Sequence, residues 1–118
     1  MQILATNITN LMESKKTLYR MTVTEGINIQ KLTDEQLAAS YPVEGYVLYS
    51  DVNEKGKENQ ILSIWTGKEK LSTISQTFIK SFVKIVDLMD GEPFNILVKC
   101  GQSKNDRKFY DCELDCSI

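Results

Sequence analysis

Residues 76–89 have the strongest helical pattern in the sequence, and β-rich segments lie on both sides of them. Apolar side chains recur there at intervals of three and four residues, which places them on one face of a helix. We expect the helix to begin after Ser75, a favourable N-cap residue. We expect it to end at Asp90 and Gly91, because Gly91 readily adopts the left-handed conformation and Pro93 prevents continuation. The sequence therefore predicts a mainly β protein with one main helix.

The β-rich segments predict three strands in a row before this helix and a hairpin after it. The expected strands before the helix are 45–52, 60–66 and 71–74, joined by the polar loop 53–59 and the turn 67–70. The hairpin joins 94–100 to 110–116 through the polar loop 101–107. An earlier segment, 27–32, alternates between apolar and polar residues and predicts a further strand.

Two shorter helices are expected nearer the N-terminus. One follows Asn10, which can cap it, with Glu13 at the third helical position. The other is a short helix or turn over 33–39, ended by Tyr41 and Pro42. Five or six strands with one main helix between strands three and four match the order of the OB-fold. We therefore expect one domain over residues 1–118, an OB-like antiparallel barrel.

The composition argues against several classes of function. The chain has no histidine, the commonest general base and metal ligand. It has no Gly-x-Ser-x-Gly or Walker-type motif, so we expect no catalytic residue, no metal and no cofactor. Three cysteines, an odd number, argue against a disulfide framework, and we expect Cys100, Cys112 and Cys116 to be small buried thiols. No apolar run reaches about 18 residues and no signal-peptide pattern occurs, so a cytoplasmic protein without membrane contact is expected.

The hairpin after the main helix has a strongly uneven charge. Although the whole chain has a formal charge of −2, its positive charge gathers near the loop 101–107. The cations there are Lys99, Lys104, Arg107 and Lys108, against the single acid Asp106. By strand alternation, Phe109 points away from the expected core beside these cations, which suits base stacking on single-stranded nucleic acid. The alternative interpretation is a solvated hairpin tip without a binding role. The exposed acidic run that we expect after it, Asp111, Glu113 and Asp115, is unfavourable for a DNA strand lying along that face.

Three further aromatic residues could take part in stacking. If Leu62 and Ile64 face the core, Trp65 lies on the opposite face of its strand. Tyr46 and Tyr49 lie on opposite faces of the neighbouring strand, so at least one of them is expected to be exposed. For each of the three, packing in the core or at its rim is the alternative.

Three segments together resemble small single-stranded DNA-binding proteins of phages and mobile elements of Gram-positive bacteria. These segments are 71–82, 85–88 and 101–109, and the resemblance is best over 45–116. It implies an OB-like barrel that coats exposed strands during replication without a cofactor. Lys104, Arg107 and Phe109 match the family's basic turn and aromatic residue. Asp106 departs from the family, which tends to have glycine there.

The sequence thus predicts a non-enzymatic, sequence-tolerant single-stranded DNA-binding protein of phage or mobile-element replication. Replication proteins are possible further partners, and a monomer or weak homo-oligomer is expected. The expected DNA-binding residues are Lys99, Lys104, Arg107, Lys108, Phe109, Trp65, Tyr49 and Tyr46. The alternative is a phage-coded protein-interaction module on the same fold, an inhibitor of a host protein or a replisome adaptor. The overall acidic charge favours that alternative, because an acidic face repels DNA and suits a basic partner.

Overall fold

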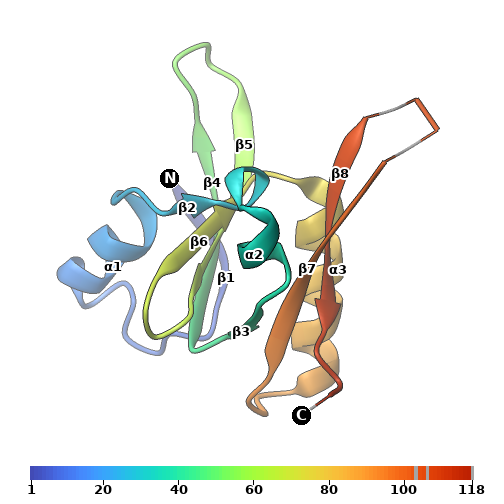
Figure 1. Cartoon of the computed structure of the whole chain (residues 1–118). Helices are drawn as coiled ribbons and strands as arrows, with labels where there is room; N and C mark the ends of the chain where they lie inside the picture. Colours follow the sequence, from blue (N-terminus) through green and yellow to red (C-terminus); the bar gives the residue numbers. More distant parts are fainter. Residues whose placement is uncertain (103, 106, 118) are drawn as a thin grey trace.

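The computed structural model describes residues 1–102, 104–105 and 107–117, and it contains two β-sheets with helices around them (Figure 1). The first sheet has the strand order β1 (Gln2–Thr6), β4 (Gly45–Val52), β5 (Glu58–Trp65), β6 (Lys70–Thr73) and β2 (Ile27–Asn28). The second has the order β3 (Ser40–Pro42), β7 (Asn95–Gln102) and β8 (Lys108–Leu114). The helical segments are α1 (Lys15–Thr22), the 3₁₀ turn η1 (Ile29–Lys31), α2 (Asp34–Leu37) and α3 (Gln76–Met89).

One extended segment, residues 40–52, belongs to both sheets. Its first part, β3, pairs with β7, and its second part, β4, pairs with β5. The change of partner falls between Val43, whose N–H donates to Phe94 O, and Glu44, whose N–H donates to Trp65 O. The mainly β class is confirmed, and so is the position of the main helix between β6 and β7. The two sheets stay open, because no pairing of β6 with β8 closes them within the described residues.

Helix α3 has the bounds and caps that the sequence predicts. The side chain of Ser75 accepts a hydrogen bond from Phe78 N–H at the N-terminal end. At the C-terminal end both Asp90 (φ 47°) and Gly91 (φ 88°) adopt left-handed conformations. The buried face of α3 carries Phe78, Ile79, Phe82 and Ile85, which join inward-facing residues of both sheets in the main core. This helix therefore fixes the two sheets relative to each other.

A second, smaller cluster lies on the opposite face of the first sheet. Leu11 and Met21, from the N-terminal segment, pack there against Val47 and Tyr49 of β4. Leu48, which lies between Val47 and Tyr49 and points to the other face of the strand, belongs to the main core. Strand β4 is therefore buried on both faces. Helix α1 thus covers part of a sheet face that would otherwise be open to solvent (Figure 1).

The N-terminal elements differ from the prediction. The first helix begins at Lys15 with Ser14 as its N-cap, because Asn10 O instead accepts the N–H groups of Glu13 and Ser14 in a preceding turn. The expected strand 27–32 ends at Asn28, whose side chain accepts Gln30 N–H and turns the chain into η1. Such local side-chain bonds compete with strand pairing.

The short helix α2 is confirmed, with a capping box between Thr33 and Gln36. Strands β1 and β3 were not expected, and β3 includes the two residues, Tyr41 and Pro42, that were expected only to end the helix. Among the described residues, no helix is long and apolar enough to cross a membrane.

Candidate nucleic-acid interface

The β7–β8 hairpin presents its four cations to solvent. Lys99 lies on β7, Lys108 begins β8, and Lys104 and Arg107 lie in the connection between the strands. All four side chains are exposed. The hairpin extends beyond the body of the molecule at the upper right of Figure 1. Asp106, where the sequence departs from the family pattern, lies outside the described residues.

Phe109 is exposed and held in place from one side. Phe109 is 42% exposed, and it lies opposite Gly101 in the β7–β8 strand pair. A Cβ atom added at Gly101 would lie 2.5 Å from Phe109 Cζ, so the ring occupies the space that a side chain at this position would take. An aromatic ring that packs over a strand glycine in this way stabilises the pairing. The rest of the ring stays open to solvent.

The base of the hairpin is anchored on two sides. On one side α3 lies along β8, and Ser75 Oγ donates to Tyr110 O at 3.4 Å. On the other side Tyr110 Oη donates to Gln30 O in η1 at 3.1 Å. The hairpin therefore rises from a fixed base toward a solvated tip.

The acidic residues that follow Phe109 do not form one exposed run, which corrects the prediction. Asp111 turns toward α3, where it accepts hydrogen bonds from Ser81 Oγ and Cys112 N–H. Asp115 accepts from Ser40 Oγ and from Ser117, and the bonds from Ser117 and Ser40 hold the pKa of Asp115 below its ordinary value. Of the three, Glu113 is exposed, whereas Asp111 and Asp115 are partly buried. Asp111, which follows Phe109 by two residues, is thus engaged with the body of the protein.

Trp65 lies outside the main core, as the alternation predicts. It is 39% exposed, whereas Leu62 and Ile64 are buried in the core. As the last residue of β5, it lies at the opposite end of that strand from the β4–β5 hairpin tip. Both hairpin tips extend toward the top of Figure 1, whereas the β5–β6 turn lies low in the view. The structure therefore does not bring Trp65 together with Phe109 in one compact site.

The expectation for the two tyrosines of β4 is wrong in its main point. Tyr49 is only 5% exposed beneath α1, its hydroxyl donates to Thr22 O at 3.0 Å, and burial raises its pKa. Tyr46 is half-buried, with its ring edge-on to Phe82 at a centroid distance of 5.3 Å. The alternation of residues along β4 cannot indicate that α1, which is distant in sequence, covers one face of the strand. Tyr49 is therefore removed from the candidate interface, and Tyr46 is engaged in core packing.

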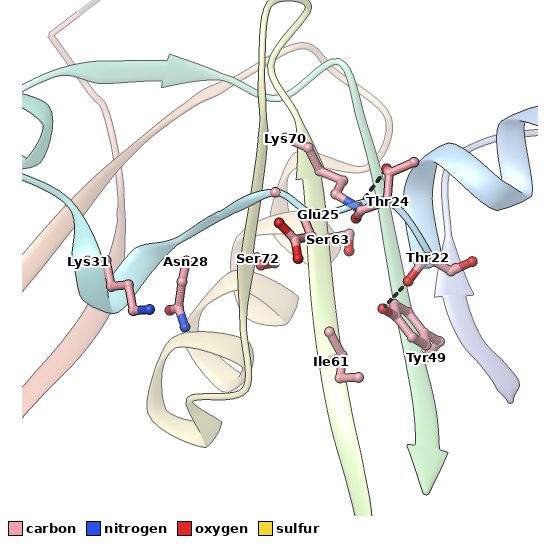
Figure 2. Close-up of a pocket in the computed structure, with 11 residues that line it drawn as sticks. Thr22, Thr24, Glu25, Asn28, Lys31, Tyr49, Ile61, Ser63, Lys70 and Ser72 are labelled. Carbon is pink, nitrogen blue, oxygen red and sulfur yellow. Dashed lines mark hydrogen bonds between the residues drawn. The ribbon is translucent and has the colours of Figure 1, made fainter. Parts of the chain in front are cut away.

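A polar hollow of about 390 Å³ lies beside Tyr49, between the segment after α1 and the outer face of β5 and β6 (Figure 2). The Nζ group of Lys70 donates to the carbonyls of Arg20 and Thr24 and to Thr24 Oγ1. Burial lowers the pKa of Lys70. Lys31, from η1, also lines this hollow and is exposed. Sequence reasoning missed both lysines, because their contacts join elements that are distant in the sequence. In the structure Lys70 lies against Gly26, where a Cβ would lie 2.8 Å from Lys70 Cε.

The cysteines divide into two classes, so the expectation of three buried thiols is wrong. Cys112 is buried in the main core, and burial raises its pKa to about 12. Cys100 and Cys116 are exposed, because Cys100 lies on the projecting part of β7 and Cys116 follows the end of β8. Among the residues that the structure describes, no three acidic or cysteine side chains are placed to hold a metal ion.

Comparison of the chain with protein-family models, with curated proteins and with solved structures found no match.

Proposed function

We propose that the chain binds single-stranded DNA through the β7–β8 hairpin, without catalysis. Phe109 is the stacking ring, and Lys99, Lys104, Arg107 and Lys108 contact phosphates. The observation that carries the proposal is the exposed Phe109 ring, which packs over Gly101 on the same hairpin as four exposed cations. The resemblance of the sequence to phage and mobile-element proteins supports a role in replication in the cytoplasm of a bacterial host.

This arrangement suits a strand of any sequence. Each base has a flat face, and one stacked base contributes about 1–3 kcal/mol. Cations near the ring attract the backbone and release counterions from it, whatever the bases are. A ring that is already held in position loses little freedom on binding, which favours affinity. The turn of Asp111 toward Ser81 removes one carboxylate from the path of the strand.

The first experiment measures binding of a labelled oligo-dT by fluorescence anisotropy. Phe109→Ala should weaken binding by about 1–3 kcal/mol. The melting temperature should fall less than after truncation of a core phenylalanine, because the ring packs over Gly101 but is partly exposed. Tyr19→Ala is a matched control, because Tyr19 is an exposed aromatic residue on α1. Unchanged binding by Phe109→Ala, together with normal binding after loss of the four cations, would contradict the proposal.

A second experiment tests the support from Gly101. Gly101→Ala should push the ring out of position and weaken binding without changing any charge. Because both substitutions act on the same ring, the double variant with Phe109→Ala should bind no more weakly than Phe109→Ala alone. Additive losses would show that Gly101 acts in another way. If the wild-type chain binds no oligonucleotide, the protein-interaction module becomes the better hypothesis.

A further inference from the structure

A second hollow, of about 510 Å³, lies where the end of α1 meets the outer face of β5. Its volume is in the range of pockets that hold small ligands. Trp65, Ile8 and Met21 supply apolar surface to its lining, and Arg20, Glu25 and Glu44 supply charged groups. This hollow is separate from the β7–β8 hairpin.

The surroundings of Trp65 leave its ring accessible to a ligand. Its neighbours across the sheet are Gly45 on β4 and Lys70 on β6. Gly45 has no side chain to cover the indole, and the Lys70 ammonium is held by the carbonyls of Arg20 and Thr24. The partly exposed indole therefore lines a space that a flat ring can enter.

The charged groups of the hollow are not neutralised by one another. Within the described part of the chain, the one ion pair joins the N-terminal amine to Asp51. The Glu44 carboxylate lies against Gly67, in close contact with the space that a Cβ there would fill, so its position is constrained by the β5–β6 turn. Glu25 and Arg20 are exposed on the α1 side. Among the described residues, the hollow thus combines carboxylate acceptors and the Arg20 guanidinium, for which no salt bridge is seen, with an aromatic ring.

We propose that this hollow takes one nucleobase of the bound strand, stacked on Trp65, and that it prefers bases with an exocyclic amino group. Carboxylates accept hydrogen bonds from an amino group such as N4 of cytosine. Thymine presents a carbonyl oxygen at the corresponding position, which a carboxylate repels. Arg20, which is exposed and lines the hollow, contacts a neighbouring phosphate in this proposal. This inference rests on the proposed function and adds to it a local base preference within otherwise sequence-tolerant binding.

The test uses Trp65 as its own reporter, because it is the only tryptophan in the chain. The full chain is titrated with oligo-dC and oligo-dT of equal length, and both indole fluorescence and anisotropy of the labelled oligonucleotide are followed. Oligo-dC should change the fluorescence saturably and bind about fivefold or more tightly than oligo-dT. Glu44→Gln should reduce that preference, because its amide can donate to thymine. Glu54→Gln, which changes an exposed carboxylate in the β4–β5 loop, should leave the preference unchanged.

The possible outcomes distinguish failure of the inference from failure of the proposed function. Binding seen by anisotropy with no change in Trp65 fluorescence overturns the inference and leaves the hairpin proposal intact. Equal affinities for the two oligonucleotides, or a preference that Glu44→Gln does not alter, overturn the carboxylate-based selection. Absence of binding to either oligonucleotide overturns both proposals.

Discussion

At the scale of single residues, the three thiols should differ sharply in reactivity. Cys100 and Cys116 are exposed, whereas Cys112 is buried and has its pKa raised to about 12. The thiolate is the reactive form, so Cys112 should stay inert near neutral pH. A thiol reagent that gives a coloured product should label two cysteines rapidly in the native protein and the third only after unfolding. Rapid labelling of all three would contradict the buried position of Cys112.

The same thiol should make the free energy of unfolding depend on pH in alkaline solution. In the unfolded chain Cys112 ionises near its ordinary pKa of 9.0, whereas in the folded protein it keeps its proton up to about 12. The contribution of the protonated Cys112 thiol to the free energy of unfolding is therefore complete below about pH 9. It is lost as the pH rises toward 12, by up to about 1.4 kcal/mol per pH unit. Chemical denaturation at several pH values should show this loss, and Cys112→Ala should reduce it. Some loss should persist in that variant, because burial also raises the pKa values of three tyrosines.

Lys70 should stabilise the end of α1. Lys70→Met keeps the apolar stem but removes the ammonium that binds the carbonyls of Arg20 and Thr24. Because hydrogen bonds to charged groups contribute about 1.5–3 kcal/mol, a loss of this order is expected. Hydrogen exchange should become faster in α1 and remain unchanged in α3. Lys68→Met, in the exposed β5–β6 turn, is the control, and an equal effect there would argue against a specific role for Lys70.

The sequence predicted single residues well where only strand alternation decides their exposure. Phe109 and Trp65 are exposed as expected, because the core residues of their strands point to the other face of the sheet. Tyr49 was placed wrongly, because its exposure depends on α1, which is distant in sequence. The engagement of Asp111 by Ser81 likewise depends on a contact between two elements that no local pattern contains.

At the scale of elements, α1 should unfold without the rest of the molecule. Its cluster, which includes Leu11 and Met21, is separate from the main core. Leu11→Ala should cost about 2–5 kcal/mol locally and increase hydrogen exchange in α1 before it affects α3. Phe82→Ala, a truncation in the main core, should destabilise the whole protein instead. Equal loss of protection in both helices after Leu11→Ala would show that the two clusters unfold together.

The prediction of elements succeeded where local signals agree with each other. For α3, the apolar periodicity, the Ser75 cap and the Gly91 terminus all indicate the same bounds. For 27–32, alternation favoured a strand, but the Asn28 side chain bonds its own backbone and ends the strand early. Strands β1 and β3 were missed because they are short and depend on pairing with distant partners.

At the scale of the whole molecule, DNA affinity should depend on salt although the chain is acidic overall. The formal charge is −2, but the cations of the β7–β8 hairpin are exposed together. The logarithm of the affinity should fall with the logarithm of salt concentration by about 0.7 per phosphate contacted on a single strand, with three to five contacts expected. Lys104→Ala should lower that slope by one contact, whereas Phe109→Ala should leave it unchanged. Affinity that does not vary with salt would exclude the phosphate contacts.

For the overall architecture, the mainly β class and the position of the main helix were predicted, whereas the expected closed barrel is not seen in the two open sheets that the structure describes. The sequence shows the order of strands β4 to β8 and the place of α3, because these follow from local patterns. It does not show that residues 40–52 are shared between two sheets, since the change of partner at Val43 and Glu44 is a backbone event without a distinctive residue pattern. The exposure of Phe109 and Trp65 was likewise predicted, but the division of the candidate residues between the β7–β8 hairpin and the Trp65 hollow required the three-dimensional structure.

The separation of the two apolar clusters has a consequence for how chains of this type diverge. One wall of the Trp65 hollow is built from residues 8–24, and this segment packs mainly on its own small cluster. Substitutions there can change which ring the hollow accepts while the main core, α3 and the β7–β8 hairpin keep their structure. We therefore expect natural variation to be greatest in this N-terminal segment, so that new selectivities arise by mutation without loss of the ability to fold.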